Sequence, residues 1–184
     1  MRLFVGIPLA EETSAALAAV EARLRAKAPG LRWSKPALWH ITLQFLGQTS
    51  AEQYATVKAR LGEVHAAPVP VQLEELSCFE RIGVLHVGVV LTPQLVALHQ
   101  RVTQAMLLCG FVPEGRAYQP HITLARSRSS EDRRRVAELA KNMTQPTRFP
   151  RFEAHEFVLY ESFPGPAGSR YEERARFALS AGSR

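Results

Sequence analysis

The sequence is poor in the residues that most often hold metal ions. It contains one aspartate, Asp132, and two cysteines, Cys78 and Cys109, whose spacing matches no metal-binding motif. Metal-dependent phosphoryl transfer needs clustered carboxylates, and zinc needs three or four close ligands. The composition therefore disfavours metal-dependent chemistry. A lone pair of cysteines also gives no disulfide framework and favours a reducing compartment.

Long apolar runs are missing as well. No segment approaches the ~18 consecutive apolar residues of a membrane span. The apolar segment Leu3–Leu9 includes Gly6 and Pro8 and is followed at once by Glu11 and Glu12, so it favours a first strand over a signal peptide. We expect a cytoplasmic protein with no membrane partner. A length of 184 residues fits one domain.

Acidic residues are outnumbered, with 17 Asp and Glu against 23 Lys and Arg. Residues 1–92 hold 9 basic against 8 acidic side chains, whereas residues 93–184 hold 14 against 9. Nineteen of the basic residues are arginine, which suits bidentate contacts to phosphate. This balance favours an anionic partner such as nucleic acid, although a codon bias toward arginine gives the same composition.

One tetrapeptide occurs twice. Residues 40–43 and 121–124 both read His-Ile-Thr-Leu, with the two histidines 81 positions apart. In a strand, alternate side chains point to opposite faces, so the histidine and the threonine share one face while isoleucine and leucine share the other. Each copy therefore presents an imidazole beside a hydroxyl and backs them with residues for a core. We expect His40 and His121 to face one groove.

The predicted elements repeat in the same order. A strand, a helix, a His-Ile-Thr-Leu strand, a second helix and a further strand occur twice, and the pattern Leu-x-Val-Gly of Leu3–Gly6 recurs at Leu85–Gly88. An internal duplication explains this most simply. We expect an α+β fold in a single domain over residues 1–184, made of two pseudo-symmetric lobes at roughly 1–82 and 83–184.

The boundaries of these elements follow from hydrophobic periodicity and capping residues. The predicted strands are Leu3–Leu9, Trp39–Leu46, Pro68–Leu76, Val84–Leu91, Tyr118–Ala125, Phe149–Tyr160 and Tyr171–Leu179. The predicted helices are Glu11–Lys27 and three that begin after Ser50 (a capping box with Gln53), after Thr92 and at Ser129 or Ser130.

Two facing imidazoles, one neutral and one protonated, make a general base and a general acid. One takes a proton from an attacking water and the other gives a proton to a leaving oxygen. Thr42 and Thr123 are placed to hydrogen-bond the phosphate oxygens as charge develops. Arg126 could neutralise that charge, but strict alternation turns it away from His121 unless the strand ends or bulges near Ala125.

Several segments closely resemble the two-histidine (2H) phosphoesterases, in particular the RNA 2′,3′-cyclic phosphodiesterases once described as 2′-5′ RNA ligases. They are Arg2–Ile7, Trp33–Pro36, Trp39–Gly47, Gly110–Phe111, Pro120–Arg126 and Leu159–Ser162 with Gly168 and Tyr171. The resemblance implies two antiparallel sheets lining a central groove, with helices packed on the outside. It implies opening of RNA 2′,3′-cyclic phosphate ends to 2′-phosphomonoesters, with no cofactor or metal.

Carried over residue by residue, the resemblance makes His40 the proton donor and His121 the proton acceptor. Thr42 and Thr123 complete the phosphate site, and the family pattern favours Arg126 there too. The sequence leaves open whether the two proton roles are exchanged.

The sequence gives weaker evidence for the positions of the residues outside the two motifs. If side chains alternate along the strand, Phe45 lies on the same face as Ile41 and Leu43 and is expected in the core. Gln44 then lies on the face of His40 and is a candidate for the groove. The other four histidines are expected to be structural or on the surface; they are His65, His86, His99 and His155.

Other functions remain open at this point. A non-catalytic RNA-binding protein would use the basic second half and would tolerate loss of both histidines. A metal site at His40 and His121 lacks nearby ligands. Within the enzyme class the substrate could be a different cyclic phosphate or a short 2′-5′ oligonucleotide, and the reverse reaction, ligation, stays open. A monomer is expected because the duplication already supplies the symmetry.

Overall fold

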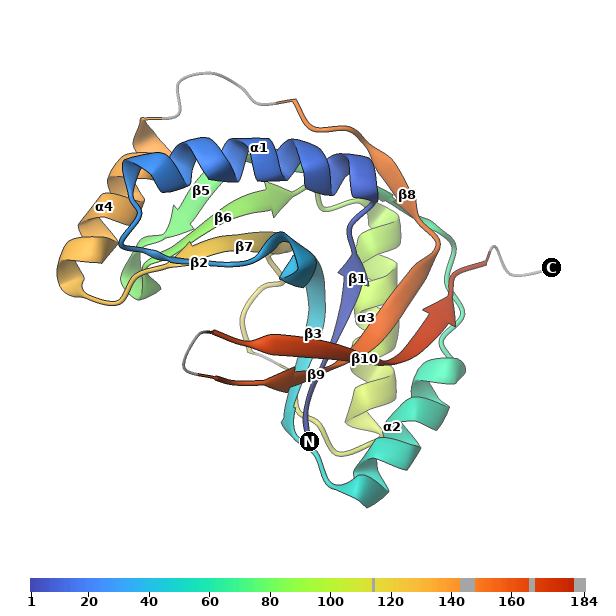
Figure 1. Ribbon diagram of the computed structural model, residues 1–184. Helices are drawn as coiled ribbons and strands as arrows, with labels where there is room; N and C mark the ends of the chain where they lie inside the picture. Colours follow the sequence, from blue (N-terminus) through green and yellow to red (C-terminus); the bar gives the residue numbers. More distant parts are fainter. Residues whose placement is uncertain (114, 143–147, 166–167, 181–184) are drawn as a thin grey trace.

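The computed structural model describes residues 1–113, 115–142, 148–165 and 168–180 (Figure 1). The helices are α1 (Glu11–Lys27), α2 (Ala51–Gly62), α3 (Pro93–Leu107) and α4 (Ser130–Lys141), with short 3₁₀ helices at Pro36–Leu38 and Glu80–Ile82. The strands are β1 (Arg2–Pro8), β2 (Arg32–Trp33), β3 (His40–Gln48), β4 (Val69–Val71), β5 (Leu73–Phe79), β6 (Val84–Val89), β7 (His121–Arg126), β8 (Phe152–Ala154), β9 (Glu156–Phe163) and β10 (Arg170–Ala178).

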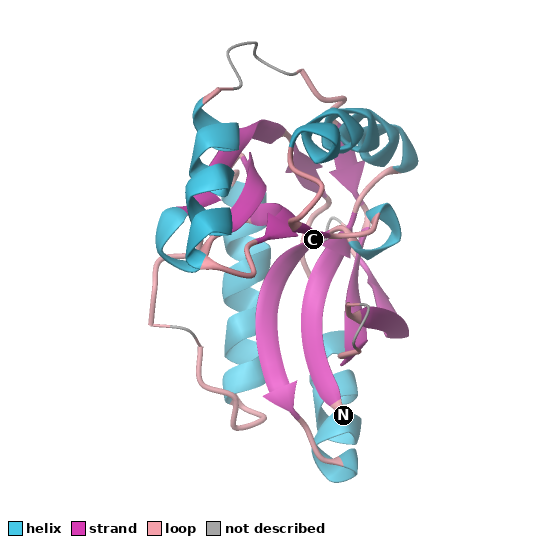
Figure 2. Cartoon of the chain, turned by 60° about the vertical axis from the view of Figure 1, so that its left-hand side comes forward, coloured by secondary structure: helices cyan, strands magenta, loops and turns pink. Residues whose placement is uncertain are grey.

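Two four-stranded antiparallel sheets form the body of the protein. The first sheet has the strand order β10-β9-β1-β3, and the second has the order β2-β7-β6-β5. Strands β4 and β8 pair with each other in a separate ribbon. Figure 2 shows the long curved strands between helices that lie on the outside of the molecule. The predicted α+β fold with two antiparallel sheets is confirmed.

Each sheet takes two strands from the other half of the chain, β9 and β10 in the first sheet and β2 and β5 in the second. Strand β5 belongs to the first half but pairs with β6 in the second sheet. Strand β9 belongs to the second half but pairs with β1 in the first sheet. The boundary expected near residue 82 therefore does not separate the two sheets, because the two repeats exchange strands.

The helices cover the sheets with apolar stripes. Figure 1 shows α1 lying along the second sheet, and α3 packs against β3 of the first. The buried apolar positions are Leu17, Val20 and Leu24 in α1 and Leu95, Leu98, Val102 and Met106 in α3. Across the described ranges, no helix combines the length and apolarity needed to cross a membrane.

Helix starts predicted from capping residues are confirmed. Ser50 and Gln53 form a reciprocal capping box at α2, and the Thr92 side chain accepts a backbone hydrogen bond at the start of α3, where Pro93 is the first residue. Ser129 caps α4 in the same way. These local signals work because a helix start needs side-chain acceptors for its unpaired amide groups.

Two predicted strands are each two strands in the structure. The segment Pro68–Leu76 divides at Gln72 into β4 and β5, and Phe149–Tyr160 divides at His155 into β8 and β9. In both cases the chain leaves the β4–β8 ribbon and enters a sheet. The prediction of single strands was wrong because hydrophobic alternation does not reveal a change of pairing partner.

A bulge interrupts each His-Ile-Thr-Leu strand at the same place. The pairing of β1 with β3 passes from Gly6–Thr42 to Val5–Gln44, so the leucine of the first motif has no partner. The pairing of β6 with β7 skips the leucine of the second motif in the same way, since His86 pairs with Thr123 and Leu85 with Ala125. Side chains beyond a bulge change face. The residues that follow each motif are therefore not where strict alternation places them.

Candidate active site

The two motif histidines are anchored identically. His40 Nδ1 lies 2.8 Å from the carbonyl oxygen of Leu38, and His121 Nδ1 lies 2.8 Å from the carbonyl oxygen of Gln119. A carbonyl oxygen only accepts hydrogen bonds, so Nδ1 donates in both rings. The other nitrogen, Nε2, is then the atom that accepts or gives a proton during chemistry.

The two imidazoles lie close enough to affect each other electrostatically. Burial lowers the pKa of His40 to about 4; the hydrogen bond to the Leu38 carbonyl opposes this change, and the charge of His121 adds to it. Strands β3 and β7, which start at these two residues, also contact each other. The structure therefore brings His40 and His121 together, as the repeated motif predicts.

Aromatic rings surround His40. The ring centroids of Phe4, Tyr171 and Tyr160 lie 4.6, 5.4 and 5.9 Å from that of His40. Gly6 leaves room for the imidazole, because a Cβ atom at this position would come within 3.2 Å of His40 Cδ2. Among the described residues, the aromatic neighbours of His40 all belong to strands β1, β9 and β10 of the first sheet.

A third histidine lies beside His121. The His86 centroid is 5.2 Å from that of His121, and His86 stacks on Phe79 at 4.1 Å. His86 is only 6% exposed. Burial, together with the charge of His121, lowers the pKa of His86 to about 4, so His86 is neutral near pH 7. The sequence reading of His86 as structural or on the surface missed this contact, and no residue pattern marks it.

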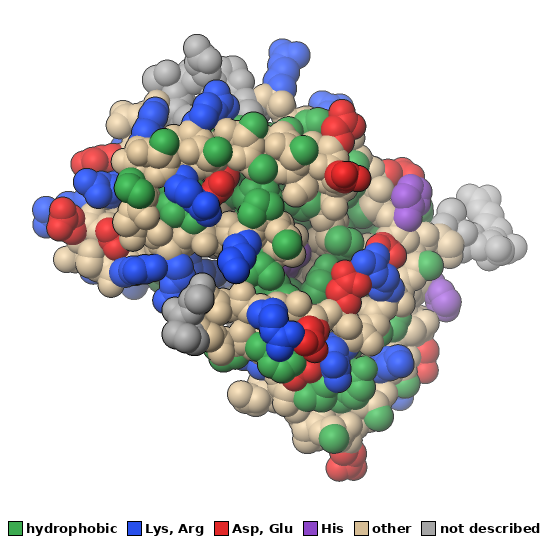
Figure 3. Space-filling model, in the orientation of Figure 1, with side chains coloured by type: hydrophobic (Ala, Val, Ile, Leu, Met, Phe, Trp, Pro, Cys, Tyr) green, Lys and Arg blue, Asp and Glu red, His purple; other side chains and the backbone are tan. Residues whose placement is uncertain are grey.

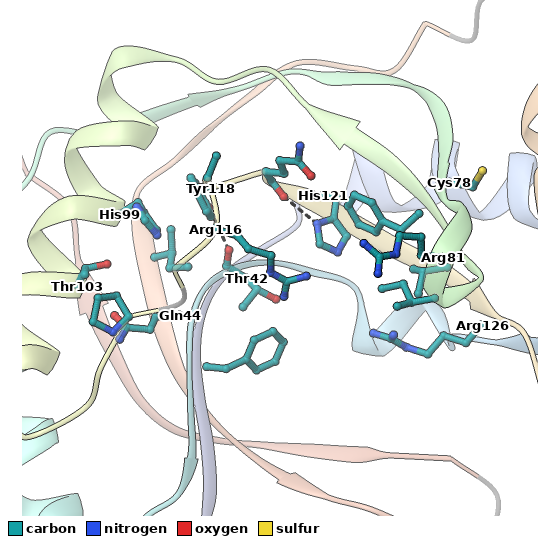
Figure 4. A pocket seen from close by; sticks show the side chains of 18 of the residues that line it. Thr42, Gln44, Cys78, Arg81, His99, Thr103, Arg116, Tyr118, His121 and Arg126 are labelled. Carbon is teal, nitrogen blue, oxygen red and sulfur yellow. Dashed lines mark hydrogen bonds between the residues drawn. The ribbon is translucent and has the colours of Figure 1, made fainter.

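One cavity of about 960 Å³ opens between the two sheets and holds most of the predicted site. Thr42, His121 and Arg126 line it, together with Phe45 and Phe79 (Figure 4). His40 and Thr123 are not among the residues that line it, although both remain partly exposed. In the space-filling view, Lys and Arg side chains lie around the hollow at the middle of this face (Figure 3).

The bulge in β7 brings Arg126 to the cavity. Strict alternation turns this side chain away from His121, but the extra residue in the strand reverses the face beyond Thr123. Arg126 is exposed and lines the same cavity as His121. The prediction that Arg126 needs a bulge near Ala125 to reach the groove agrees with this geometry.

The matching bulge in β3 overturns the expectation for Phe45. This ring is 57% exposed and lines the cavity, so its assignment to the core was wrong. Gln44 also lines the cavity, as a groove candidate should, but it is buried, with 7% of its surface exposed. Both differences have one cause, because the alternation used to place these residues fails after Leu43.

The described residues contain no group of three or more His, Cys, Asp or Glu side chains that could hold a metal ion. Cys78 lines the cavity, but its thiol is kept protonated because burial raises its pKa. The polar groups that face the cavity include the imidazole of His121, the hydroxyl of Thr42 and the guanidinium group of Arg126.

Two facing antiparallel sheets, each with a His-x-Thr strand beside a shared cavity, define a phosphoesterase of the two-histidine class. Residues 13–162 match the family described as the 2′-5′ RNA ligase superfamily. The chain belongs to this family.

Similar proteins cover from about half of the chain to almost all of it. The RNA 2′,3′-cyclic phosphodiesterase of Archaeoglobus fulgidus is 26% identical over 176 residues, which span 94% of this chain and 97% of that protein. The RNA 2′,3′-cyclic phosphodiesterase of Bacillus subtilis is 33% identical over 106 residues, 55% of this chain and 58% of that protein. The crystal structure of E. coli LigT in its apo form superposes with a TM-score of 0.78 at 26% identity and covers 98% of both chains.

Proposed function

We propose that this protein hydrolyses the 2′,3′-cyclic phosphate ends of RNA to 2′-phosphomonoesters, with His40 and His121 as general acid and base. The observation that supports this most is the pair of histidines, each held through Nδ1 by a backbone carbonyl at 2.8 Å and electrostatically coupled to the other. Relatives named RNA 2′,3′-cyclic phosphodiesterase support the substrate.

The proton transfers use the Nε2 atom of each ring, because Nδ1 is held by a backbone carbonyl. His121 accepts a proton from a water molecule as its oxygen attacks phosphorus, and the P–O3′ bond breaks. His40 gives its proton to the departing O3′. The product keeps phosphate on O2′, and the two histidines have exchanged protonation states, which solvent restores.

The remaining site residues stabilise charge on the phosphate. The hydroxyl groups of Thr42 and Thr123 donate hydrogen bonds to the non-bridging oxygens as negative charge builds up in the transition state. Arg126, which the bulge places at the cavity, offsets part of this charge with its guanidinium group.

To act as the acid, His40 must be protonated. Burial opposes this, because it lowers the pKa of the His40 ring to about 4. A bound phosphate supplies the opposite charge beside the ring and raises that pKa. The surrounding rings of Phe4, Tyr160 and Tyr171 add cation–π stabilisation of the imidazolium form. Binding of the substrate therefore favours protonation of His40.

The protein needs no second subunit for this reaction, and its partner is RNA. Both histidines come from one chain, so a monomer is sufficient for catalysis, and the mechanism uses no cofactor or metal ion. The arginine-rich second half is suited to hold an RNA strand. Because the proton transfers are reversible, 2′-5′ ligation is expected only when ends carrying a cyclic phosphate are concentrated.

The test is to incubate the purified protein with an oligonucleotide ending in a 2′,3′-cyclic phosphate, in the presence of EDTA. Phosphorus NMR against 2′- and 3′-phosphate standards identifies the product. We expect the 2′-phosphate, formed at the same rate with and without the chelator. Mainly 3′-phosphate would reverse the assigned bond cleavage. Binding without turnover would instead identify a non-catalytic RNA-binding protein.

A further inference from the structure

Arginine side chains gather where the second sheet ends. Arg126 is the last residue of β7, and Arg32 of β2 is its direct partner in the antiparallel pairing. Arg81 belongs to the 3₁₀ helix Glu80–Ile82 and lines the cavity. In Figure 4 the side chains of Arg81 and Arg126 lie on the same side of Thr42 as His121. All three arginines are exposed.

A glycine brings a fourth arginine to this place. Gly83 follows the 3₁₀ helix with a φ of 61°, and a Cβ atom there would come within 2.6 Å of Arg133 Cγ. Because glycine has no side chain, the stem of Arg133 packs against the turn that carries Arg81. Arg133 lies in the first turn of α4, and α4 contacts this 3₁₀ helix. We call Arg32, Arg81, Arg126 and Arg133 the arginine rim.

The arginine rim has no acidic counterpart in the protein. None of its four side chains forms an ion pair with an acidic residue in the described ranges. Two acidic side chains of the same segments are engaged elsewhere, since Glu80 pairs with Lys141 at 3.9 Å and Asp132 accepts a hydrogen bond from the backbone amide of Arg128. The rim therefore carries uncompensated positive charge.

The pairing of Arg32 with Arg126 increases this excess. Residues directly opposite each other in a sheet point to the same face, and like charges in such positions destabilise the sheet. A cyclic phosphate carries one negative charge, so the reacting group bound by Arg126 offsets only one of the four cations. The remaining arginines point to a ligand with further negative charges.

Arginines on the other side of the groove are neutralised within the protein. Arg170, Arg174 and Arg176 of β10 each pair with glutamates of β9 or β10. In Figure 3 basic and acidic side chains lie next to each other below and to the right of the hollow. The two sides of the groove therefore differ in charge, although both contain arginine.

We propose that the arginine rim holds the RNA strand next to its reacting end, so that the RNA leaves the groove over the end of the second sheet and α4, and not over β9 and β10. This inference rests on the proposed function. An RNA that ends in a 2′,3′-cyclic phosphate continues only on its 5′ side, and each further nucleotide adds one phosphodiester charge. Arg32, Arg81 and Arg133 contact these phosphodiesters, while Arg126 contacts the reacting phosphate.

Guanidinium groups suit this task. Each offers several N–H donors in one plane, which can pair with two phosphate oxygens at once. Contacts to the phosphate backbone hold a strand in place without selecting its sequence, and they weaken as salt rises because bound counterions are released. The rim therefore favours oligonucleotides over mononucleotides, irrespective of sequence and most strongly at low salt.

The experiment compares kcat/KM for a short oligonucleotide that ends in a 2′,3′-cyclic phosphate with that for a 2′,3′-cyclic mononucleotide, between about 50 and about 200 mM salt. We expect the wild type to prefer the oligonucleotide at low salt and to lose most of this preference at high salt. In the double variant Arg32→Gln/Arg133→Gln, the slope of log kcat/KM against log salt for the oligonucleotide should be smaller by about 1.4, because each phosphate contact to a single strand contributes about 0.7. The rate with the mononucleotide should be unchanged.

The matched control removes the same charge from the other side of the groove. Arg170→Gln/Arg176→Gln should keep the oligonucleotide preference and its salt slope, since these arginines are paired with glutamates. Arg32→Lys/Arg133→Lys keeps the charge of the rim and should retain most of the slope. If Arg32→Gln/Arg133→Gln does not fold, Arg133→Gln alone should lower the slope by about 0.7.

Each other outcome would overturn the proposal. Equal losses in the two glutamine double variants would show an effect of net charge alone. A wild type without preference for the oligonucleotide, or an unchanged slope in Arg32→Gln/Arg133→Gln, would leave the rim without a role in RNA binding. Equal losses on both substrates would assign Arg32 and Arg133 to the reacting phosphate.

Failure of the proposed function gives a different result. In that case the wild type cleaves neither substrate. The rim is then tested by fluorescence anisotropy with the same oligonucleotide carrying a dye at its 5′ end. Wild-type binding should weaken with salt more steeply than binding by Arg32→Gln/Arg133→Gln, and equal slopes would overturn the proposal.

Discussion

His40 and His121 have the same backbone anchor but different neighbours. His40 packs against Phe4, Tyr160 and Tyr171, whereas His121 packs against His86 and Phe79 and lines the cavity. Duplication of one strand motif accounts for the shared anchor. Unequal surroundings of this kind are what the proposed acid and base roles require of two chemically identical side chains.

Register shows how the two surroundings diverged. Gly6 pairs with the threonine of the first motif, and His86 pairs with that of the second, so these two residues occupy equivalent positions. A glycine there leaves room for the ring of His40 against the first sheet. A histidine there fills the space beside His121, which stays nearer the cavity. This position therefore accounts for part of the difference between the surroundings of the two motif histidines.

The largest effect is expected from removing either catalytic ring. His40→Ala and His121→Ala should each lower kcat/KM by about 10²–10⁴, the usual contribution of a general acid or base. The double variant should be little worse than either single one, because the two rings act as a unit. The measurement is turnover of a 2′,3′-cyclic nucleotide. A single variant with wild-type turnover would remove that histidine from the mechanism.

A smaller loss is expected from the position that distinguishes the two sheets. A methyl group in Gly6→Ala meets the Ile41 carbonyl oxygen at 3.1 Å and His40 Cδ2 at 3.2 Å, so the imidazole must shift by a few tenths of an ångström. We expect kcat to fall by about tenfold, because small displacements of a catalytic group are costly. His86→Ala is the matched change in the second sheet and should cost less, since Gln119 still anchors His121. Equal losses would mean that the two positions have the same function.

The smallest effect concerns stability in acid. The pKa of His86 is about 4 in the folded protein and ordinarily about 6.5, so between these values the unfolded chain binds more protons. Stability from this group is complete above pH 6.5 and is lost as the pH falls toward 4. His86→Phe keeps a buried ring without a titrating group. Its free energy of unfolding should fall less between pH 7 and pH 4 than that of the wild type, by on the order of 2 kcal/mol.

Urea unfolding at the two pH values measures this difference directly. His65→Phe is a suitable control, because it makes the same substitution at an exposed histidine. An identical pH dependence in His86→Phe and the wild type would show that His86 is not the acid-sensitive group.

Helix caps and the motif strands could be predicted from the sequence, because their signals are local. The pairing between distant strands could not be predicted. The caps at Ser50 and Thr92 and the repeated His-Ile-Thr-Leu strands are signalled within a few residues of where they act. The exchange of β5 and β9 depends on partners far along the chain, and no nearby residue encodes it. The same applies to the bulge that exposes Phe45 and to the contact of His86 with His121.

The repeated pattern at Leu3–Gly6 and Leu85–Gly88 illustrates this limit of prediction from the sequence. It correctly indicates a duplicated strand, but the alignment that it suggests is two residues out of register. In sequence Gly6 matches Gly88, whereas in the sheets Gly6 is equivalent to His86. A shift of two residues preserves which face each side chain occupies. The core pattern therefore looks the same in both alignments, and only the structure distinguishes them.

The pH dependence of kcat, which reports the protonation of the enzyme with substrate bound, tests the central claim most directly in the wild type and the two histidine variants. The wild type should give a bell-shaped profile, with a low-pH limb from the base and a high-pH limb from the acid. The residual activity of His40→Ala should lack the high-pH limb, and that of His121→Ala should lack the low-pH limb. Persistence of both limbs in both variants would contradict acid–base catalysis by this pair, and the opposite assignment of limbs would contradict the roles given to the two rings.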